Sequence, residues 1–240
     1  MEKEFEASRQ RIRKYSKNAS LARAAGQFMK ESMRAKYSYN FSWMGRMLIQ
    51  YPEDVLVMQE IIWEIKPDLI IETGTAHGGS TVFYASMLKL LGRGHVISID
   101  INVYPENKKD LARHPLARSI TLIEGSSTDP KTIASVKRLA QGKKKILVVL
   151  DSLHSHQHVL QELQLYSPLV TKGCYIVVFD TFIEDMPPHS YPNRPWDKGS
   201  NPKTAVWEFL KKNSRFAIDK NLQKKLFITG CPDGYLKRIK

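Results

Sequence analysis

Hydrophobic positions change their spacing near Pro67. Ahead of it, apolar side chains are scattered through a polar, charge-rich segment, 3–37, and recur at helical spacing in 53–65. We predict one or two helices in the first segment and one helix in the second, which Pro67 ends. The aromatic stretch between them, 39–45, is predicted to be a loop.

Beyond Pro67, short apolar runs alternate with longer stretches in which apolar residues recur at helical spacing. The apolar runs predict strands at 69–73, 94–101, 119–125, 145–151 and 173–180, with two late strands at 216–220 and 225–230. Helices are predicted at 80–91, 129–140, 158–170 and 204–213. A poorly ordered, basic connection is expected before residue 119, and a proline-rich loop at 183–202.

This alternation of strands and helices indicates an α/β fold. We expect a Rossmann-like, doubly wound, mostly parallel sheet with helices on both faces and right-handed crossovers. An N-terminal helical extension precedes it. The predicted division is a basic helical extension over 1–50 and a Rossmann-like domain over 51–240.

The net charge of the 240 residues is +13, and the excess is concentrated at the two ends of the chain. Residues 1–50 hold 11 Lys and Arg against 4 Asp and Glu, and residues 203–240 hold 10 against 3. These basic ends are either solvated helix faces or a contact surface for an anionic partner or lipid. No nucleic-acid-binding module is visible in the sequence, so no specific nucleic acid is expected.

Neither a membrane span nor a secretory leader is expected. The chain has no apolar run of about 18 residues, and its N-terminus lacks the apolar core of a signal peptide. Its two cysteines, Cys174 and Cys231, imply no disulfide framework. We therefore expect a cytoplasmic protein in a reducing setting.

A glycine-rich turn follows the first strand of the α/β region, in the sequence ETGTAHGGS (72–80). Its glycine spacing matches neither the dinucleotide fingerprint nor a Walker loop, which disfavours a phosphate-centred site. The acid that opens it, Glu72, would repel a pyrophosphate but suits an ammonium or sulfonium group. Asp100, at the end of the next strand, suits the two hydroxyls of a ribose. The combination predicts S-adenosylmethionine as the cofactor.

Two further predicted strands end in acids, Asp151 and Asp180. In an open parallel sheet, ligands bind at the carboxyl ends of strands near the point where the strand order reverses, so Asp100, Asp151 and Asp180 should line one crevice. Two converging carboxylates suit Mg²⁺, which would hold a substrate hydroxyl and lower its pKa. The alternative is that Asp151 or Asp180 only caps the helix that follows.

Three histidines, His154, His156 and His158, follow Asp151 closely. A zinc site is disfavoured, because residues two apart on a helix point in different directions. His154 is the candidate general base, since an imidazole with a pKa near 6.5 removes a proton at neutral pH; a structural or surface role is its alternative. For His156 and His158 the structural or surface role is favoured. His77, in the glycine turn, is a candidate contact of cofactor or substrate.

Four segments of the chain together resemble the cephalosporin hydroxylase family, which also contains rhamnosyl O-methyltransferases and related macrolide-sugar O-methyltransferases. They are LIIETGTAHGGSTVFYASML (69–88), LDSLHSHQHVLQELQLYSPLV (150–170), GCYIVVFDTFIEDMP (173–187) and RPWDKGSNPKTAVWEFL (194–210). The resemblance covers about residues 38–240. It implies the Rossmann-like fold of S-adenosylmethionine-dependent methyltransferases and an oligomeric enzyme.

The resemblance also assigns roles to individual residues of the cofactor site. The family's ribose acid matches Asp100, and its stretch near the adenine matches Ser126 and Ser127. Its cofactor turn matches Glu72, Gly74, Thr75, His77, Gly78, Gly79 and Ser80.

For the metal site, the resemblance matches Asp151 to one acid ligand and Asp180 to the second member of an adjacent acid pair. The first member of that pair is Phe179 here, which removes a carboxylate ligand. Glu184 or Asp185, in the following loop, could replace it. The family's general base, three residues after the first metal acid, matches His154.

These features predict an S-adenosylmethionine-dependent, Mg²⁺-assisted O-methyltransferase that acts on a hydroxyl of a small molecule such as a sugar, glycolipid or natural product. The loop 183–202, with Tyr191, Trp196 and Asp197, is predicted to cover the acceptor site. One alternative is a hydroxylase, for which no iron site is visible. The other is a non-catalytic cofactor-binding protein at an anionic surface, which Phe179 favours.

Overall fold

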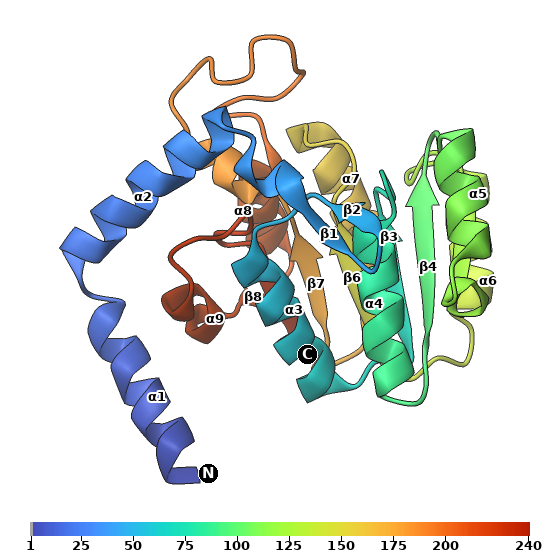
Figure 1. Ribbon diagram of the computed structural model, residues 1–240, viewed down its shortest axis with the longest axis horizontal. Coiled ribbons are helices and arrows are strands. Elements are labelled where there is room, and N and C mark those ends of the chain that lie inside the picture. Colours follow the sequence, from blue (N-terminus) through green and yellow to red (C-terminus); the bar gives the residue numbers. More distant parts are fainter. Residues whose placement is uncertain (1) are drawn as a thin grey trace.

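A seven-stranded sheet forms the centre of the computed structural model, which describes residues 2–240 (Figure 1). Its strand order is β5-β4-β3-β6-β7-β9-β8, and only β9 runs antiparallel to its neighbours. The strands are β3 (Leu69–Thr73), β4 (His95–Asp100), β5 (Ile120–Glu124), β6 (Ile146–Leu150), β7 (Tyr175–Val178), β8 (Phe216–Ile218) and β9 (Tyr235–Arg238).

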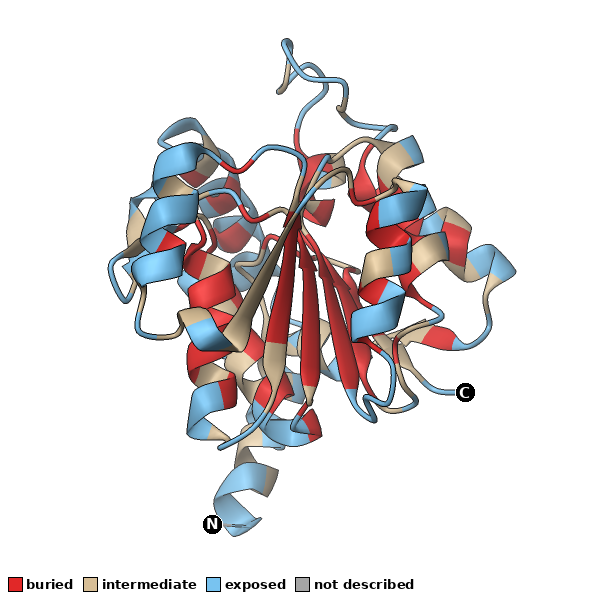
Figure 2. Ribbon diagram, turned by 90° about the vertical axis from the view of Figure 1, so that its right-hand side faces the viewer, coloured by how far each residue is buried: buried red, intermediate tan, exposed pale blue. Residues whose placement is uncertain are grey.

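Helices cover both faces of this sheet, so the predicted Rossmann-like α/β fold is confirmed (Figure 2). Most of them begin with the signals that the sequence carries: α6 has Asp129 as its N-cap followed by Pro130, and Asn201 caps α8. The helices of the sheet region are α3 (Pro52–Ile65), α4 (Gly79–Leu90), α5 (Pro105–Arg113), α6 (Pro130–Leu139), α7 (His156–Tyr166), α8 (Pro202–Lys212) and α9 (Lys220–Lys225).

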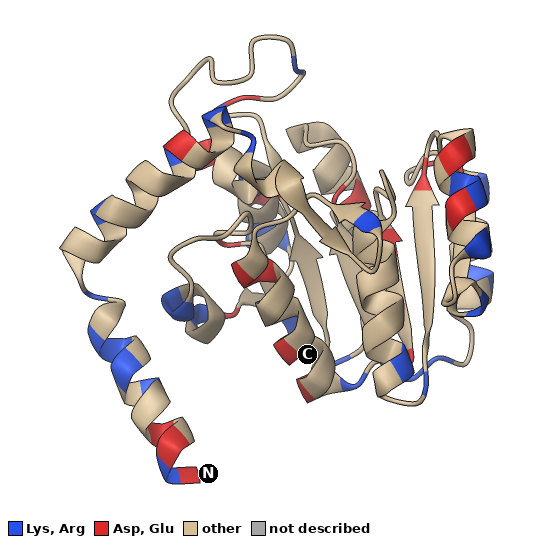
Figure 3. Cartoon of the chain, in the orientation of Figure 1, with Lys and Arg blue, Asp and Glu red and all other residues tan. Residues whose placement is uncertain are grey.

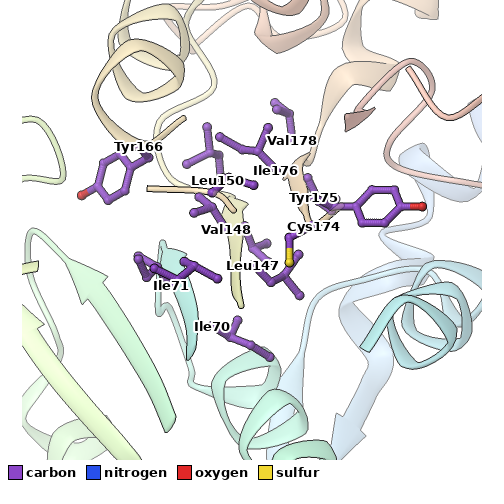
Figure 4. Packing of buried hydrophobic residues seen from close by; sticks show 14 of the residues in the cluster. Ile70, Ile71, Leu147, Val148, Leu150, Tyr166, Cys174, Tyr175, Ile176 and Val178 are labelled. Carbon is purple, nitrogen blue, oxygen red and sulfur yellow. The ribbon is translucent and has the colours of Figure 1, made fainter. Parts of the chain in front are cut away.

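The hydrophobic core lies between the central strands and these helices (Figure 4). Every residue of β3, β6 and β7 is buried, as expected of strands that are covered on both faces. Ile71, Val148 and Ile176 come from three adjacent strands and are completely inaccessible to solvent. Burying each such side chain contributes roughly 1.5–3 kcal/mol.

The strand order reverses between β3 and β6. The chain moves outward from β3 to β4 and β5, and then returns to β6 on the other side of β3. The last residues of β3 and β6, Thr73 and Leu150, are paired in the ladder. The segments that leave these two strands therefore start side by side, at the place where open α/β sheets bind ligands.

Two N-terminal helices, α1 (Glu2–Tyr15) and α2 (Ala19–Arg34), confirm the prediction for 3–37. Helix α1 buries none of its residues and extends away from the sheet (Figure 1). It contacts the α9 region, where the Tyr15 hydroxyl donates to the Lys225 carbonyl at 3.0 Å. Along residues 2–240, no helix combines the length and hydropathy needed to span a bilayer.

The aromatic stretch 39–45, predicted to be a loop, instead begins an antiparallel hairpin. A 3-10 helix (Tyr37–Asn40) leads into β1 (Phe41–Trp43) and β2 (Arg46–Leu48). The indole of Trp43 donates to Ser86 of α4 at 3.0 Å, so the hairpin is packed on the sheet region. Strands of three residues carry too little periodicity to be recognised in a sequence.

Two further predictions, for the connection before residue 119 and for 225–230, were also wrong. The basic connection before residue 119 contains helix α5, whose single buried residue is Leu111. The segment 225–230 is not a strand, because α9 occupies residues up to Lys225 and the last strand is β9. Helix α9 is capped by Asp219, whose carboxylate accepts from two backbone amides.

Candidate active site

A cavity of about 860 Å³ opens at the carboxyl ends of the parallel strands, where the order of strands reverses. Its size is typical of a small-molecule site. Most of the residues predicted for the site line it: Gly74, Thr75, Gly79, Ser80, Asp100, Ser126, Ser127, Asp151, His154 and Asp180. Three do not line it: Glu72, His77 and Gly78.

The glycine turn between β3 and α4 is shaped by close contact with other segments. A Cβ on Gly74, whose φ is +89°, would lie 1.9 Å from the backbone oxygen of Asp151. A Cβ on Gly79 would lie 2.1 Å from the backbone oxygen of Met47. These two glycines allow the turn to touch both the end of β6 and the hairpin strand β2.

Glu72 lies beneath the turn, between the sheet and α4. Its Oε2 accepts hydrogen bonds from the hydroxyls of Thr81 and Ser98. Burial raises the pKa of Glu72 to about 7, against the opposing effect of the hydroxyl donors. In the described chain, its Oε1 has no hydrogen-bond partner. Direct contact of Glu72 with a cofactor stays a prediction.

Asp100 faces the cavity and also holds the turn. Its Oδ2 accepts from the backbone amides of Thr75 at 2.9 Å and Ala76 at 3.0 Å, and its Oδ1 accepts from the amide of Asn102 at 3.1 Å. A carboxylate has about four acceptor positions, so Asp100 keeps capacity for an additional donor from a ligand. The ribose role predicted for Asp100 is compatible with this geometry.

Asp151, His154 and Asp180 meet at one wall of the cavity. One ligand atom from each lies within 4.8 Å of the others, and His154 Nε2 is 3.2 Å from Asp180 Oδ2. The pKa of the Asp151 carboxyl is raised well above its usual range by burial and by the nearby carboxylates of Asp180 and Glu72. A divalent cation would neutralise this repulsion, so these donors fit a cation.

This cluster adds His154 to the metal-binding acids predicted from the sequence. The imidazole is held against Trp196, edge to face, with 4.9 Å between ring centroids. Asp180 itself adopts a left-handed conformation, with φ of 55°, just beyond β7. A non-glycine residue in this region indicates that the surrounding structure fixes its direction.

The two acids suggested as replacements for the missing ligand at Phe179 point elsewhere. Glu184 accepts from the amide of Gly199 at 2.7 Å, and Asp185 forms an ion pair with Lys203 at 2.7 Å. Both acids therefore hold the loop and the start of α8, and neither lines the cavity. The prediction that Glu184 or Asp185 compensates for Phe179 was wrong.

A structural role was favoured for both His156 and His158, but only His156 fits it. Its ring bonds Thr204 at 2.8 Å and Glu208 at 3.1 Å, which ties α7 to α8. His158 instead lines the cavity. The sequence does carry one signal for it, because a glutamate four residues later lies on the same helix face.

Residues of the predicted N-terminal extension also reach the cavity, which the sequence did not indicate. Tyr39, Leu48 and Gln50 line it. Gln50 is almost fully buried, and its amide has no hydrogen-bond partner within residues 2–240. The domain boundary at residue 50 stays a prediction, but the segment before it helps to build the site.

The loop 183–202 stands at the carboxyl-end side of the sheet (Figure 1). Tyr191 and Trp196 line the cavity, as expected of residues that cover an acceptor. Asp197 does not; it accepts from the backbone amides of His189 and Lys198 within the loop.

Comparison with known proteins gives consistent matches. The family model for rhamnosyl O-methyltransferase/CmcI matches residues 35–239. The rhamnosyl O-methyltransferase of Mycobacterium leprae is 34% identical over 202 residues, which cover 82% of each chain. That of Mycobacterium bovis is 32% identical over 200 residues, covering 82% of this chain and 78% of the relative. These matches confirm the resemblance found in the sequence.

The fold also matches solved structures. A structure of CmcI with magnesium and S-adenosylmethionine superimposes with a TM-score of 0.60 at 18% identity, covering 84% of this chain and 78% of that one. This likeness supports the arrangement of the sheet and its helices.

Proposed function

The chain belongs to the rhamnosyl O-methyltransferase/CmcI family and is an S-adenosylmethionine-dependent O-methyltransferase, and from that premise we propose that it methylates a sugar hydroxyl with the help of a divalent cation. The observation that carries this proposal is the meeting of Asp151, His154 and Asp180 on one cavity wall. The same wall adjoins the glycine turn, since Gly74 touches the backbone of Asp151.

The cofactor is proposed to lie along the strand ends from β6 to β5. Asp100 would accept the ribose hydroxyls, and Ser126 and Ser127 would border the adenine. The glycine turn would hold the methionyl part. This orientation puts the methyl group close to Asp151, because Gly74 and Asp151 are in backbone contact.

A cation is proposed at the carboxylates of Asp151 and Asp180, with Mg²⁺ as the simplest choice. When bound, it would polarise the acceptor hydroxyl and fix its orientation. Phe179 contributes no ligand, so water would complete the coordination. Two carboxylates with an imidazole also suit Mn²⁺ and related metals.

His154 is proposed to take the hydroxyl proton on Nε2. Once that nitrogen carries the proton, the Asp180 carboxylate, 3.2 Å from it, would stabilise the imidazolium. As the acceptor oxygen attacks the methyl carbon in line, the carbon–sulfur bond breaks and its electrons stay on sulfur. The products are a methyl ether and S-adenosylhomocysteine, and the proton remains on His154.

The acceptor is proposed to be a saccharide. The relatives named above are rhamnosyl O-methyltransferases, and the cavity here is lined by Tyr39, Tyr191 and Trp196. Aromatic faces suit the C–H side of a sugar ring, and the unpaired amide of Gln50 offers a hydrogen bond to a hydroxyl. No feature of the cavity specifically favours the hydroxylase or the non-catalytic alternative.

Methyl transfer from labelled S-adenosylmethionine to a panel of rhamnosides and other glycosides tests the proposal. We expect transfer to at least one glycoside. Parallel assays with and without added Mg²⁺ or Mn²⁺ measure the contribution of the cation. His154→Ala should lower kcat at least about 100-fold while cofactor binding persists. Failure of the wild-type chain to bind S-adenosylmethionine, measured by calorimetry, would overturn the proposal.

Three broader predictions accompany this function. Assembly into a homo-oligomer and a cytoplasmic location stay predictions. So does contact of the basic ends with an anionic surface, for which the Lys and Arg residues on α1 and α9 are the suggested contacts (Figure 3).

A further inference from the structure

A chain of polar side chains runs through the cavity wall next to Ser127. His158 Nε2 lies 3.1 Å from the hydroxyl oxygens of both Ser127 and Ser152. Ser152 in turn donates to Glu162 Oε1 at 2.8 Å. His158, Ser127 and Ser152 all line the cavity, whereas Glu162 is completely buried behind them.

Three elements contribute to this chain. Ser127 follows β5, and Ser152 follows β6. Helix α7 supplies His158 and Glu162, which are four residues apart and share one face. From the next turn of the same face, the Tyr166 hydroxyl donates to the Ser127 carbonyl at 2.8 Å. One face of α7 thus holds two strand-end segments against the cavity.

Counting hydrogens fixes the direction of each bond. A hydroxyl has one hydrogen, and that of Ser152 goes to the Glu162 carboxylate. The bond between Ser152 and His158 therefore requires a hydrogen on His158 Nε2. Because the single Nε2 hydrogen is then shared between the two serines, Ser127 Oγ is also an acceptor in its contact with His158. The hydroxyl hydrogen of Ser127 is left without an acceptor among residues 2–240, and Ser127 faces the cavity.

This arrangement is costly unless it serves the ligand. A fully buried carboxylate loses hydration, and one Glu162 oxygen lacks a partner in the described part of the chain. Apolar residues at 158 and 162 would pack the same helix face without that cost. The presence of His158 and Glu162 is explained if this side of the cavity must hold a hydrogen-bond donor in one fixed direction.

We propose that Glu162 and His158 are positioning residues that aim the Ser127 hydroxyl as a hydrogen-bond donor at a ring nitrogen of the adenine. Glu162 accepts the hydroxyl hydrogen of Ser152, so Ser152 can only accept from His158 Nε2. The protonated Nε2 then makes Ser127 Oγ an acceptor and leaves the Ser127 hydroxyl hydrogen free for the ligand. The proposal rests on the proposed function, because it requires the adenosyl group to lie at Ser127. The aimed hydroxyl would select adenine over other nucleobases in the cofactor.

Calorimetric titration with S-adenosylhomocysteine tests the chain of contacts. Ser127→Ala should weaken binding about tenfold because it removes the donor, and His158→Ala should weaken it by a similar factor because the Ser127 hydroxyl loses its fixed direction. The double variant should lose little more than either single variant, because both act on one contact. His158→Gln, whose amide can donate from nearly the same place, should recover most of the affinity. Turnover at saturating cofactor should change less than about threefold, so the loss appears in KM.

His156→Ala is the matched control, since His156 lies on the same helix but bonds α8. It should bind S-adenosylhomocysteine as the wild type does, even if its melting temperature falls. Equal affinity of His158→Ala and the wild type would overturn the positioning role. So would equal losses in His158→Ala and His156→Ala, because they would reflect the helix alone.

Analogues of S-adenosylhomocysteine that lack one ring nitrogen test the donor directly. We expect one of the 1-deaza, 3-deaza and 7-deaza compounds to bind the wild type about tenfold more weakly, and this difference to disappear in Ser127→Ala. Equal binding of all three to the wild type would overturn the inference alone. If the wild type bound none of the adenosyl compounds, the proposed function itself would fail.

Discussion

Two carboxyl groups near the cavity both have raised pKa values, but their surroundings differ. Glu72 is enclosed by protein and receives hydrogen bonds from the hydroxyls of Thr81 and Ser98. Asp151 faces the cavity and has the carboxylate of Asp180 as a close neighbour. The hydroxyl donors around Glu72 partly offset the cost of burying it. The Asp151 carboxylate receives no such hydroxyl bonds within residues 2–240, and a bound cation would offset its repulsion with Asp180. An acid that confronts another acid in a cavity is therefore the better sign of function.

Replacing Asp151 with Asn tests the role of the acid that faces the cavity. We expect methyl transfer to fall at least about 100-fold, because a cation ligand next to the acceptor is lost. The free energy of unfolding should stay the same or rise, because the repulsion between Asp151 and Asp180 is removed. Methyl transfer, Mn²⁺ titration by electron paramagnetic resonance and urea unfolding measure the three effects.

Asp185→Asn provides a control, because Asp185 bonds Lys203 and does not line the cavity. It should retain the affinity for Mn²⁺. If Asp151→Asn bound Mn²⁺ as tightly as the wild type, the cavity acid would have no role in holding a cation.

Replacing Glu72 with Gln should change the pH dependence of the free energy of unfolding and leave metal binding nearly unchanged. The folded chain keeps the Glu72 proton up to about pH 7, whereas the unfolded chain loses it near pH 4.5. Between these values the folded state binds more protons, so the free energy of unfolding falls as pH rises, by up to about 3 kcal/mol. Glu72→Gln has no such proton and should flatten this dependence.

Urea unfolding at several pH values from 4.5 to 8 measures the difference between Glu72→Gln and the wild type. The affinity of Glu72→Gln for Mn²⁺ should stay within about threefold of the wild type, since Glu72 does not line the cavity. A large loss of Mn²⁺ affinity would instead mean that the two acids act as one unit.

The contrast between these acids also explains which parts of the site could be predicted from the sequence. Asp151 follows the last ladder residue of β6, and Asp180 lies beyond the end of β7. Side chains just past a ladder can face the crevice, so these acids were predictable from their position. Glu72 lies inside the β3 ladder, opposite Ser98 and Val149. Its side chain must point to one face of the sheet, and the sequence does not say how far it lies from the cavity.

The same distinction applies to the fold. Strands such as β6 and β7 were predictable because burial on both faces requires a continuous apolar run. The hairpin β1–β2 and helix α5 were missed because each buries few residues and depends on contacts with distant segments. His158 contacts Ser127 and Ser152, which come from two other segments, so the spacing to Glu162 indicates a shared helix face but not the place of His158 at the cavity.

The smallest expected effect belongs to Thr81→Val, which removes one donor from Glu72 while keeping the shape of the side chain. At pH 8, where Glu72 is largely ionised, we expect a loss of about 1–2 kcal/mol in the free energy of unfolding, because a buried carboxylate loses a hydrogen bond. At pH 5 the loss should be smaller, since Glu72 is then protonated and the bond is weaker. Urea unfolding at both pH values measures it. An equal loss at pH 5 and pH 8 would assign the cost to packing around Thr81 and would remove hydroxyl support as the feature that separates Glu72 from Asp151.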